Sequence, residues 1–122
     1  MKIKVTKLDK LWADCVKQRD GYRCRRCGRT GKPRGMHAAH IEGRSKKSTR
    51  WALENGLCLC FLCHQWFDQH KGIRDEWMAR EGIMTHTQRD YLRLMSAMTW
   101  DKDTMRIEYT LKHFIGSVKC ER

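Results

Sequence analysis

Two cysteine pairs of the same spacing decide the fold of this chain. Residues 24–27 read Cys-Arg-Arg-Cys and residues 60–63 read Cys-Phe-Leu-Cys. Each C-x-x-C pair can present two thiolates to one tetrahedral Zn²⁺, so the two pairs together complete a closed structural site. Cys58 lies two residues before the second pair and could in principle replace one ligand, but the C-x-x-C spacing favours the set Cys24, Cys27, Cys60 and Cys63.

The cysteine content indicates metal ligation because the sequence carries no signal for secretion. Residues 1–5 contain no apolar segment and no small-residue cleavage site, so we expect a cytoplasmic location. In that reducing compartment, seven cysteines in a short chain are typical of metal sites and not of disulfide bonds. No run of about 18 apolar residues is present, so the sequence predicts no membrane span.

Length, composition and charge predict one small domain with an acidic partner. The 122 residues fall in the usual single-domain range, so a two-domain enzyme is not expected. Hydrophobic residues make up 40% of the chain and charged residues 33%, so the core is modest and would gain from a bound metal. The net charge of +12 is typical of proteins that bind nucleic acid or an anionic membrane.

Most of this charge lies between the two cysteine pairs. Residues 23–50 contain ten Lys or Arg residues and a single acid, Glu42. We expect this loop to bind phosphates, a contact that gives affinity but no sequence recognition. A membrane-surface role is disfavoured because these residues fill an irregular loop and do not lie opposite an apolar helical face. The candidate DNA contacts are Arg25, Arg26, Arg34, Arg44, Lys46, Lys47 and Arg50.

Hydrophobic periodicity predicts the order of the elements. An amphipathic stripe of Leu8, Leu11, Trp12, Cys15 and Val16 predicts a helix over residues 6–20, with a capping box that starts at Thr6. The expected elements that follow are strands within residues 35–41 and 57–59 and helices over residues 63–70 and 73–81.

The C-terminal third is predicted to be mainly helical. Residues 87–90 can cap a helix that carries Tyr91, Leu94, Met95 and Met98 on one face, which either completes the core or forms a dimer interface. Residues 105–118 fit both a strand and a helix, and we favour the helix. The predicted fold class is therefore α+β, in one domain. Its expected parts are an N-terminal helix over 1–21, a zinc-clamped module over 22–72 and a helical extension over 73–122.

Several short motifs in order resemble the zinc-clamped HNH endonucleases. They are residues 19–28, residues 39–41 (Ala-His-Ile), Asn55, residues 57–58 and residues 60–64, so the resemblance covers 19–70. Residues 37–41 and 48–51 are further similar to phage recombination endonucleases of the NinG type. The resemblance implies a ββα-metal module, a DNA substrate, phage or bacterial host cytoplasm, and a catalytic Mg²⁺ or Mn²⁺ beside the structural Zn²⁺.

The resemblance also implies a role for each site residue. His40 matches the general base, because a neutral imidazole can accept a proton from the attacking water near pH 7. Asn55 matches the residue that secures the loop orienting this base, and His64 matches the ligand of the catalytic cation. Hydrolysis in this family leaves a 5′ phosphate and a 3′ hydroxyl.

One position departs from the family pattern. Many HNH enzymes place a metal ligand immediately before the base, where this chain has Ala39. Asp68, one helical turn after His64, is our first candidate for the missing ligand, since residues four apart share a helix face. His37 is the alternative, although on a regular strand it would point away from the face of His40.

Two functions remain open from the sequence. The first is a metal-dependent DNA endonuclease, which would need a homodimer to cut both strands. Its target stays open between an ordinary duplex, a branched recombination junction and RNA. The second is a non-catalytic zinc DNA-binding protein. The enzyme is favoured because a binding protein has no need for His40, Asn55 and His64 together.

Overall fold

The fold is α+β and is built on a two-stranded antiparallel sheet. The computed structural model describes residues 5–31, 35–98 and 107–112. Strand β1 (Met36–His40) pairs with β2 (Gly56–Cys60) in a register that places Met36 opposite Cys60 and His40 opposite Gly56. The strands predicted within residues 35–41 and 57–59 are thus confirmed, with β2 starting and ending one residue further out.

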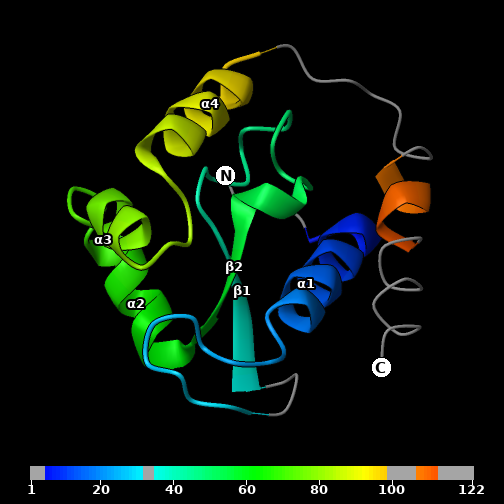
Figure 1. Ribbon diagram of the computed structural model, residues 1–122. Helices are drawn as coiled ribbons and strands as arrows, with labels where there is room; N and C mark the ends of the chain where they lie inside the picture. The colour runs from blue at the N-terminus through cyan, green and yellow to red at the C-terminus, as the bar shows by residue number, and fades with distance from the viewer. Residues whose placement is uncertain (1–4, 32–34, 99–106, 113–122) are drawn as a thin grey trace.

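Helices cover both faces of this sheet, as Figure 1 shows. Helix α1 (Lys7–Arg19) lies on one side, and α2 (Phe61–Gln69) and α3 (Arg74–Arg80) lie on the other. The short 3₁₀ helix η2 (Leu53–Asn55) precedes β2, and α4 (His86–Ser96) packs beyond α3. Because the sheet lies between helices, its two faces belong to two separate hydrophobic clusters.

Helix α1 forms where the sequence predicts it. The Thr6 Oγ1 accepts a hydrogen bond from the Asp9 amide, and the Asp9 Oδ2 accepts one from the Thr6 amide at 2.7 Å, so the predicted capping box is present. The apolar stripe of the helix packs into the smaller cluster, which contains Leu8, Trp12, Cys15, Val16, Trp51 and Leu111. Trp12 also packs against Gly56, where a Cβ would lie only 2.5 Å from the Trp12 ring.

The larger cluster lies on the side of α2, α3 and α4. Its largest members come from β2, α2 and α3, among them Leu57, Leu59, Phe67 and Met78. All residues of strand β2 are buried, and residues 57–60 belong to this cluster. The sheet therefore fixes the position of α2, which follows β2 directly, relative to α1.

Helix α4 begins two residues earlier than predicted and faces the other way. Its cap is Thr85, which forms a capping box with Gln88. The predicted apolar face is exposed, with Tyr91 at 61% and Leu94 at 63%, while Arg89 and Leu92 are buried instead. The helix is oriented by charge: Arg89 forms ion pairs with Glu42 and with Asp75 of α3, which turns the opposite face inward.

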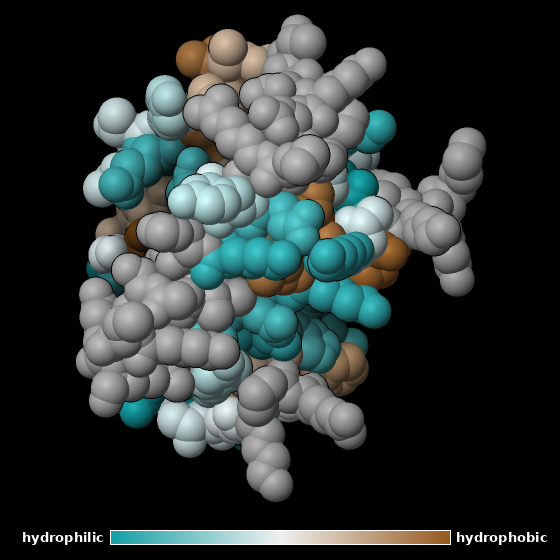
Figure 2. All heavy atoms as spheres, turned by 90° about the vertical axis from the view of Figure 1, so that its right-hand side faces the viewer, coloured by the Kyte–Doolittle hydropathy of each residue, from teal (hydrophilic) through white to brown (hydrophobic). Residues whose placement is uncertain are grey.

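The described part of the C-terminal third is helical at residues 107–112, which agrees with the helix favoured there. The other residues of the predicted C-terminal helix lie outside the described residues. Helices within residues 5–31, 35–98 and 107–112 are all too short or too polar to cross a bilayer. On the face that carries α1, hydrophilic side chains cover the centre, with small apolar patches between them (Figure 2).

Candidate functional site

Four cysteine sulfurs converge at one end of the sheet. The Sγ atoms of Cys24, Cys27, Cys60 and Cys63 all lie within 4.8 Å of one another. The Sγ atoms of Cys27 and Cys60 are 3.8 Å apart, which is the separation of two sulfurs bound at about 2.3 Å to a tetrahedral zinc. Four thiolates in a closed cluster are the ligands that structural zinc prefers. The predicted zinc ligands therefore come together.

Local backbone structure explains why these four side chains meet. Cys24 and Cys27 lie in a tight turn, closed by hydrogen bonds from the Gly28 amide to the Cys24 carbonyl at 3.0 Å and from the Cys24 amide to the Arg29 carbonyl at 2.8 Å. Gly28 has φ of 79°, a left-handed conformation that favours glycine. On the other side, Cys60 ends β2 and caps α2, so Cys63 lies one helical turn further on.

The electrostatic surroundings favour the Cys24 thiolate. Burial by itself raises the pKa of this thiol, but the amides of Cys27, Cys60 and Arg26 donate toward its sulfur and bring the pKa down to about 6. Arg26 also donates to the Cys63 Sγ at 3.6 Å. These donors offset part of the negative charge that four thiolates bring together.

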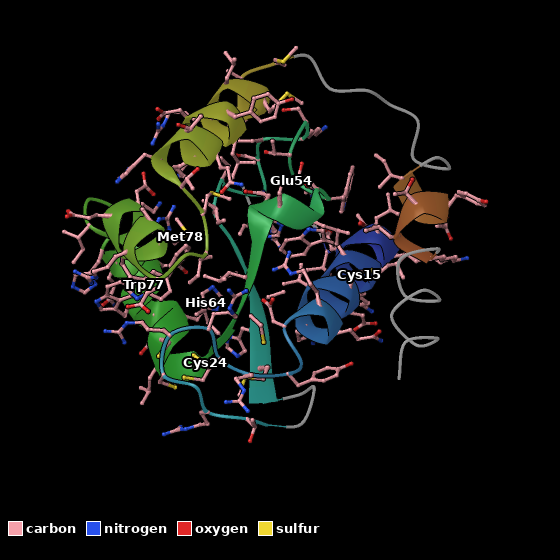
Figure 3. The ribbon with its side chains drawn as sticks, viewed as in Figure 1. Cys15, Cys24, Glu54, His64, Trp77 and Met78 are labelled. Carbon is pink, nitrogen blue, oxygen red and sulfur yellow. The ribbon has the colours of Figure 1, made fainter. Side chains whose placement is uncertain are left out.

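Within the described residues, two further cysteines, Cys15 and Cys58, do not belong to this cluster. Cys58 and Cys15 are fully buried, and burial raises the pKa of each thiol to about 11, so both behave as small apolar side chains. Figure 3 shows Cys15 on α1, on the side of the sheet opposite to Cys24 and His64. Cys120 lies outside the described residues.

His40 lies at the end of β1 and is held in one orientation. Its Nε2 is 2.9 Å from the carbonyl oxygen of Arg50. A carbonyl oxygen only accepts hydrogen bonds, so Nε2 carries the proton and Nδ1 is left as a proton acceptor. The imidazole stacks on Trp12 with ring centroids 3.9 Å apart and an interplanar angle of 10°. Burial lowers the pKa of His40 below 6.5, against the opposing effect of the Arg50 carbonyl, so the ring is neutral near pH 7.

Asn55 ties down the loop that supplies this carbonyl. Its Oδ1 accepts from the Glu42 amide at 2.7 Å, and its Nδ2 donates at 3.0 Å to the carbonyls of Glu42 and Thr49. The side chain is fully buried, and the residue before Arg50 is thereby fixed to the start of β2. Loss of this amide would release the segment that orients His40.

His64 and Asp68 lie one turn apart on α2. The His64 Nε2 is 3.4 Å from an oxygen of Asp68, and its Nδ1 is 2.9 Å from the Nδ1 of His37. Burial lowers the pKa of His64, Asp68 raises it and His37 lowers it, so the net shift favours a neutral ring. Neutral imidazole and carboxylate are ligands for divalent cations. The expected alternation along β1 holds, since His37 contacts α2 while His40 contacts α1.

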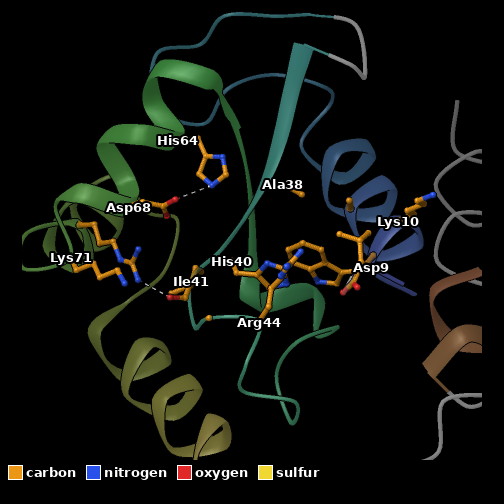
Figure 4. A pocket seen from close by; sticks show the side chains of 14 residues that line it. Asp9, Lys10, Ala38, His40, Ile41, Arg44, His64, Asp68 and Lys71 are labelled. Carbon is orange, nitrogen blue, oxygen red and sulfur yellow. Dashed lines mark hydrogen bonds and ion pairs between the residues drawn. The ribbon is translucent and has the colours of Figure 1, made fainter. Parts of the chain in front are cut away.

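A pocket of about 620 Å³ joins these groups. His40 lines one side, next to Trp12 of α1, and the pair His64 and Asp68 lines the other, with Ala38 of β1 between them (Figure 4). His37 does not line this pocket, although its Nδ1 contacts the Nδ1 of His64. Ala39 is fully buried in the larger cluster and does not line the pocket.

The pocket also has basic residues at its rim. Lys10 of α1, Arg44 of the basic loop, Lys71 and Arg74 line it together with the histidines. Of these only Arg44 belongs to the DNA contacts predicted from the sequence. Lys71 lies in the turn after α2, and Lys10 lies on α1, so neither residue could be assigned to the pocket without knowledge of how these elements pack.

The other predicted DNA contacts have different surroundings. Lys46 and Lys47 are exposed in the loop. Arg25 forms an ion pair with Asp20, and Arg26 lies over the Trp66 ring at 4.0 Å. Arg34 lies outside the described residues. The prediction for Arg50 is wrong. Its guanidinium is buried and forms an ion pair with Asp9, so it cannot reach a phosphate at the surface. This pairing is what allows a cation to be buried.

Comparison with known families agrees with this geometry. The model of the HNH endonuclease family matches residues 24–71. This HNH match contains His40, Asn55, His64 and both cysteine pairs, whose four sulfurs are placed to hold a metal ion. It covers less than half of the chain, and α1 lies outside it. No curated protein and no solved structure matches the chain.

Proposed function

We propose that this protein is a metal-dependent DNA endonuclease that hydrolyses phosphodiester bonds with His40 as general base. The observation that carries the proposal is that one pocket is lined by a neutral, oriented imidazole on one side and by a histidine–carboxylate pair on the other. A phosphodiester in this pocket would have a proton acceptor and a cation site on different sides, as a single-metal hydrolysis requires.

His40 and Asn55 have different roles in the proposed reaction. His40 accepts through Nδ1 the proton that the attacking water loses as its oxygen bonds to phosphorus, and the bond from phosphorus to the 3′ oxygen breaks. The 3′ oxygen then takes a proton from solvent, which leaves a 5′ phosphate and a 3′ hydroxyl. Asn55 keeps His40 in this tautomer through the Thr49–Arg50 backbone.

His64 and Asp68 are the residues that would hold the catalytic cation. Bound Mg²⁺ or Mn²⁺ there would offset the charge that develops on the phosphate and on the departing oxygen. Two protein ligands fit Mg²⁺, which usually keeps several waters and binds through one or two side chains plus substrate phosphates. Asp68 is our choice over His37 for this role, and the choice is supported by the pocket lining, which includes Asp68 but not His37.

The basic rim supports a nucleic-acid substrate. Lys10 and Arg44 on one side and Lys71 on the other can contact phosphates that flank the scissile bond, which adds affinity in a salt-dependent manner. The finer parts of the proposal are a role in phage-type recombination, a branched or junction substrate and a homodimer for double-strand cleavage. The first two are supported by the similarity of residues 37–41 and 48–51 to NinG-type enzymes.

The test is nicking of supercoiled plasmid by the zinc-loaded protein with added Mg²⁺ or Mn²⁺. His40→Ala should abolish nicking and keep DNA binding, whereas His86→Ala, at an exposed histidine outside the pocket, should nick like the wild type. Equal nicking by His40→Ala and wild type would refute the role of His40. If no variant nicks a plasmid or a four-way junction and all bind DNA, the alternative of a zinc DNA-binding protein would replace the proposal.

A further inference from the structure

Helix α1 contacts the candidate base through two separate groups, although it lies outside the HNH match. The first is Trp12, whose ring stacks on the His40 imidazole. Trp12 is itself fixed, because its Nε1–H donates to the carbonyl of Ala52 at 2.8 Å and its ring is 1% exposed. One face of His40 is therefore defined by α1.

The second contact runs from Asp9 through Arg50. The Asp9 Oδ1 accepts from the Arg50 Nε at 2.8 Å, and the Oδ2 accepts from the Arg50 Nη2 at 2.6 Å, so the guanidinium is held at two points. The indole Nε1–H of Trp51 also donates to the Asp9 Oδ1 at 3.0 Å. Both partners of the ion pair have side chains only 7% exposed. The side chains of residues 50 and 51 thereby anchor this part of the backbone to α1.

The same residue that Asp9 anchors supplies the carbonyl that orients His40. The Arg50 carbonyl oxygen is the partner of the His40 Nε2. Its position depends on Asn55 at one end, through Thr49, and on Asp9 at the other, through the Arg50 side chain. A capping box alone needs no such contact, because the Asp9 carboxylate has to reach only Thr6 for that purpose.

Energetics argue that this ion pair serves more than stability. The desolvation free energy of two buried charges is about as large as the free energy of their attraction, so a buried ion pair adds little to the stability of a small domain. A bidentate guanidinium–carboxylate contact is, however, a geometrically specific one. It fixes the direction of the Arg50 backbone more tightly than apolar packing would.

We propose that α1 is part of the catalytic unit, with Asp9 and Trp12 as positioning residues that set the tautomer and the orientation of His40. The inference rests on the proposed function for its kinetic consequence but not for its structural one. It implies that residues 24–71 are not sufficient for a competent site.

The test uses Asp9→Glu with Asp14→Glu as a matched control. Glutamate at position 9 keeps the charge and the capping box, where Glu is a usual residue, but it moves the carboxylate by one methylene relative to Arg50. Asp14 is exposed on the same helix. Arg50→Lys is the second variant: it keeps a cation opposite Asp9 but removes the planar two-point contact.

The first readout is long-range ¹H–¹⁵N NMR of the histidine rings in the zinc-loaded full chain, with the His40 signals assigned by their absence in His40→Gln. The wild type and Asp14→Glu should show His40 as a single Nε2–H tautomer at pH 7. Asp9→Glu or Arg50→Lys should show a mixture of tautomers. A wild-type ring that is not the Nε2–H tautomer, or a ring unchanged in both variants, would overturn the inference.

The second readout is the plasmid-nicking rate at saturating DNA. A displaced base costs on the order of ten- to a hundred-fold in rate, so Asp9→Glu should lose that much in kcat with DNA affinity within about twofold of wild type. A loss of kcat and affinity together, with unchanged NMR signals, would indicate a structural role only. If the wild type cuts nothing while the tautomer still responds to Asp9→Glu, the proposed function fails and the positioning role stands.

Discussion

Replacing Asn55 by alanine is the most informative single change in this protein. The side chain makes three hydrogen bonds to backbone groups of Glu42 and Thr49, and it is fully buried. At about 1 kcal/mol net for each bond, the change should lower the free energy of unfolding by about 3 kcal/mol. The value is a lower bound, because the Glu42 amide and the Thr49 carbonyl lose their buried partner.

The assay is urea unfolding of the zinc-loaded protein, followed by the fluorescence of its five tryptophans. At an m-value of about 1.5 kcal/mol/M, Asn55→Ala should lower the urea midpoint by about 2 M. The control Gln65→Ala removes an exposed amide from α2 and should shift the midpoint by less than about 0.3 M. A shift as small as the control's would refute the reasoning that Asn55 holds the loop of Glu42 to Arg50.

Three further outcomes test other parts of the structure. Cys60→Ser should lose bound zinc and the cooperative melting transition, since metal binding and folding are coupled in small clamps; an unchanged melting curve with full zinc content would argue against the structural site. His64→Ala should raise the Mg²⁺ concentration needed for nicking and lower the rate while zinc content stays the same, and an unchanged Mg²⁺ dependence would remove His64 from the cation site. Acid should destabilise the protein in two steps. Burial lowers the pKa of His40 below 6.5, so its contribution is complete above pH 6.5 and is lost as the pH falls through the lowered value. Burial raises the pKa of Asp9, but its hydrogen bonds to Arg50 and Thr6 bring it from 3.8 down to about 2, so about 2 kcal/mol should be lost between pH 4 and pH 2. Urea midpoints at pH 7, 5, 4 and 2 measure both steps, and a flat profile would contradict them.

Local patterns in the sequence predict much of this architecture. The C-x-x-C spacing is enough to group the four cysteines, because a tetrahedral ion imposes the same geometry on any chain that binds it. The stripe and capping box of α1 are equally local, since both depend on residues three or four apart. The alternation of a strand correctly separates His37 from His40.

Features that depend on distant partners could not be predicted in this way. Arg50 reads as one more cation in a basic loop until α1 brings Asp9, 41 residues earlier, beside it. The cap of α4 is a choice between Thr85 and Thr87, each followed three residues later by an acceptor side chain, and the buried ion pairs of Arg89 decide it. The pocket itself needs α1 and α2 on either side of the sheet, which no short motif encodes.

The close approach at Gly56 shows that the proposed role of His40 places a demand on a residue that carries no reacting atom. Gly56 stands opposite His40 in the sheet, and the space a Cβ would need is occupied by the Trp12 ring that stacks on His40. Any substitution there pushes the tryptophan away from the histidine. In a random library selected for activity, position 56 would accept as few alternatives as position 40, although it contributes no functional group at all.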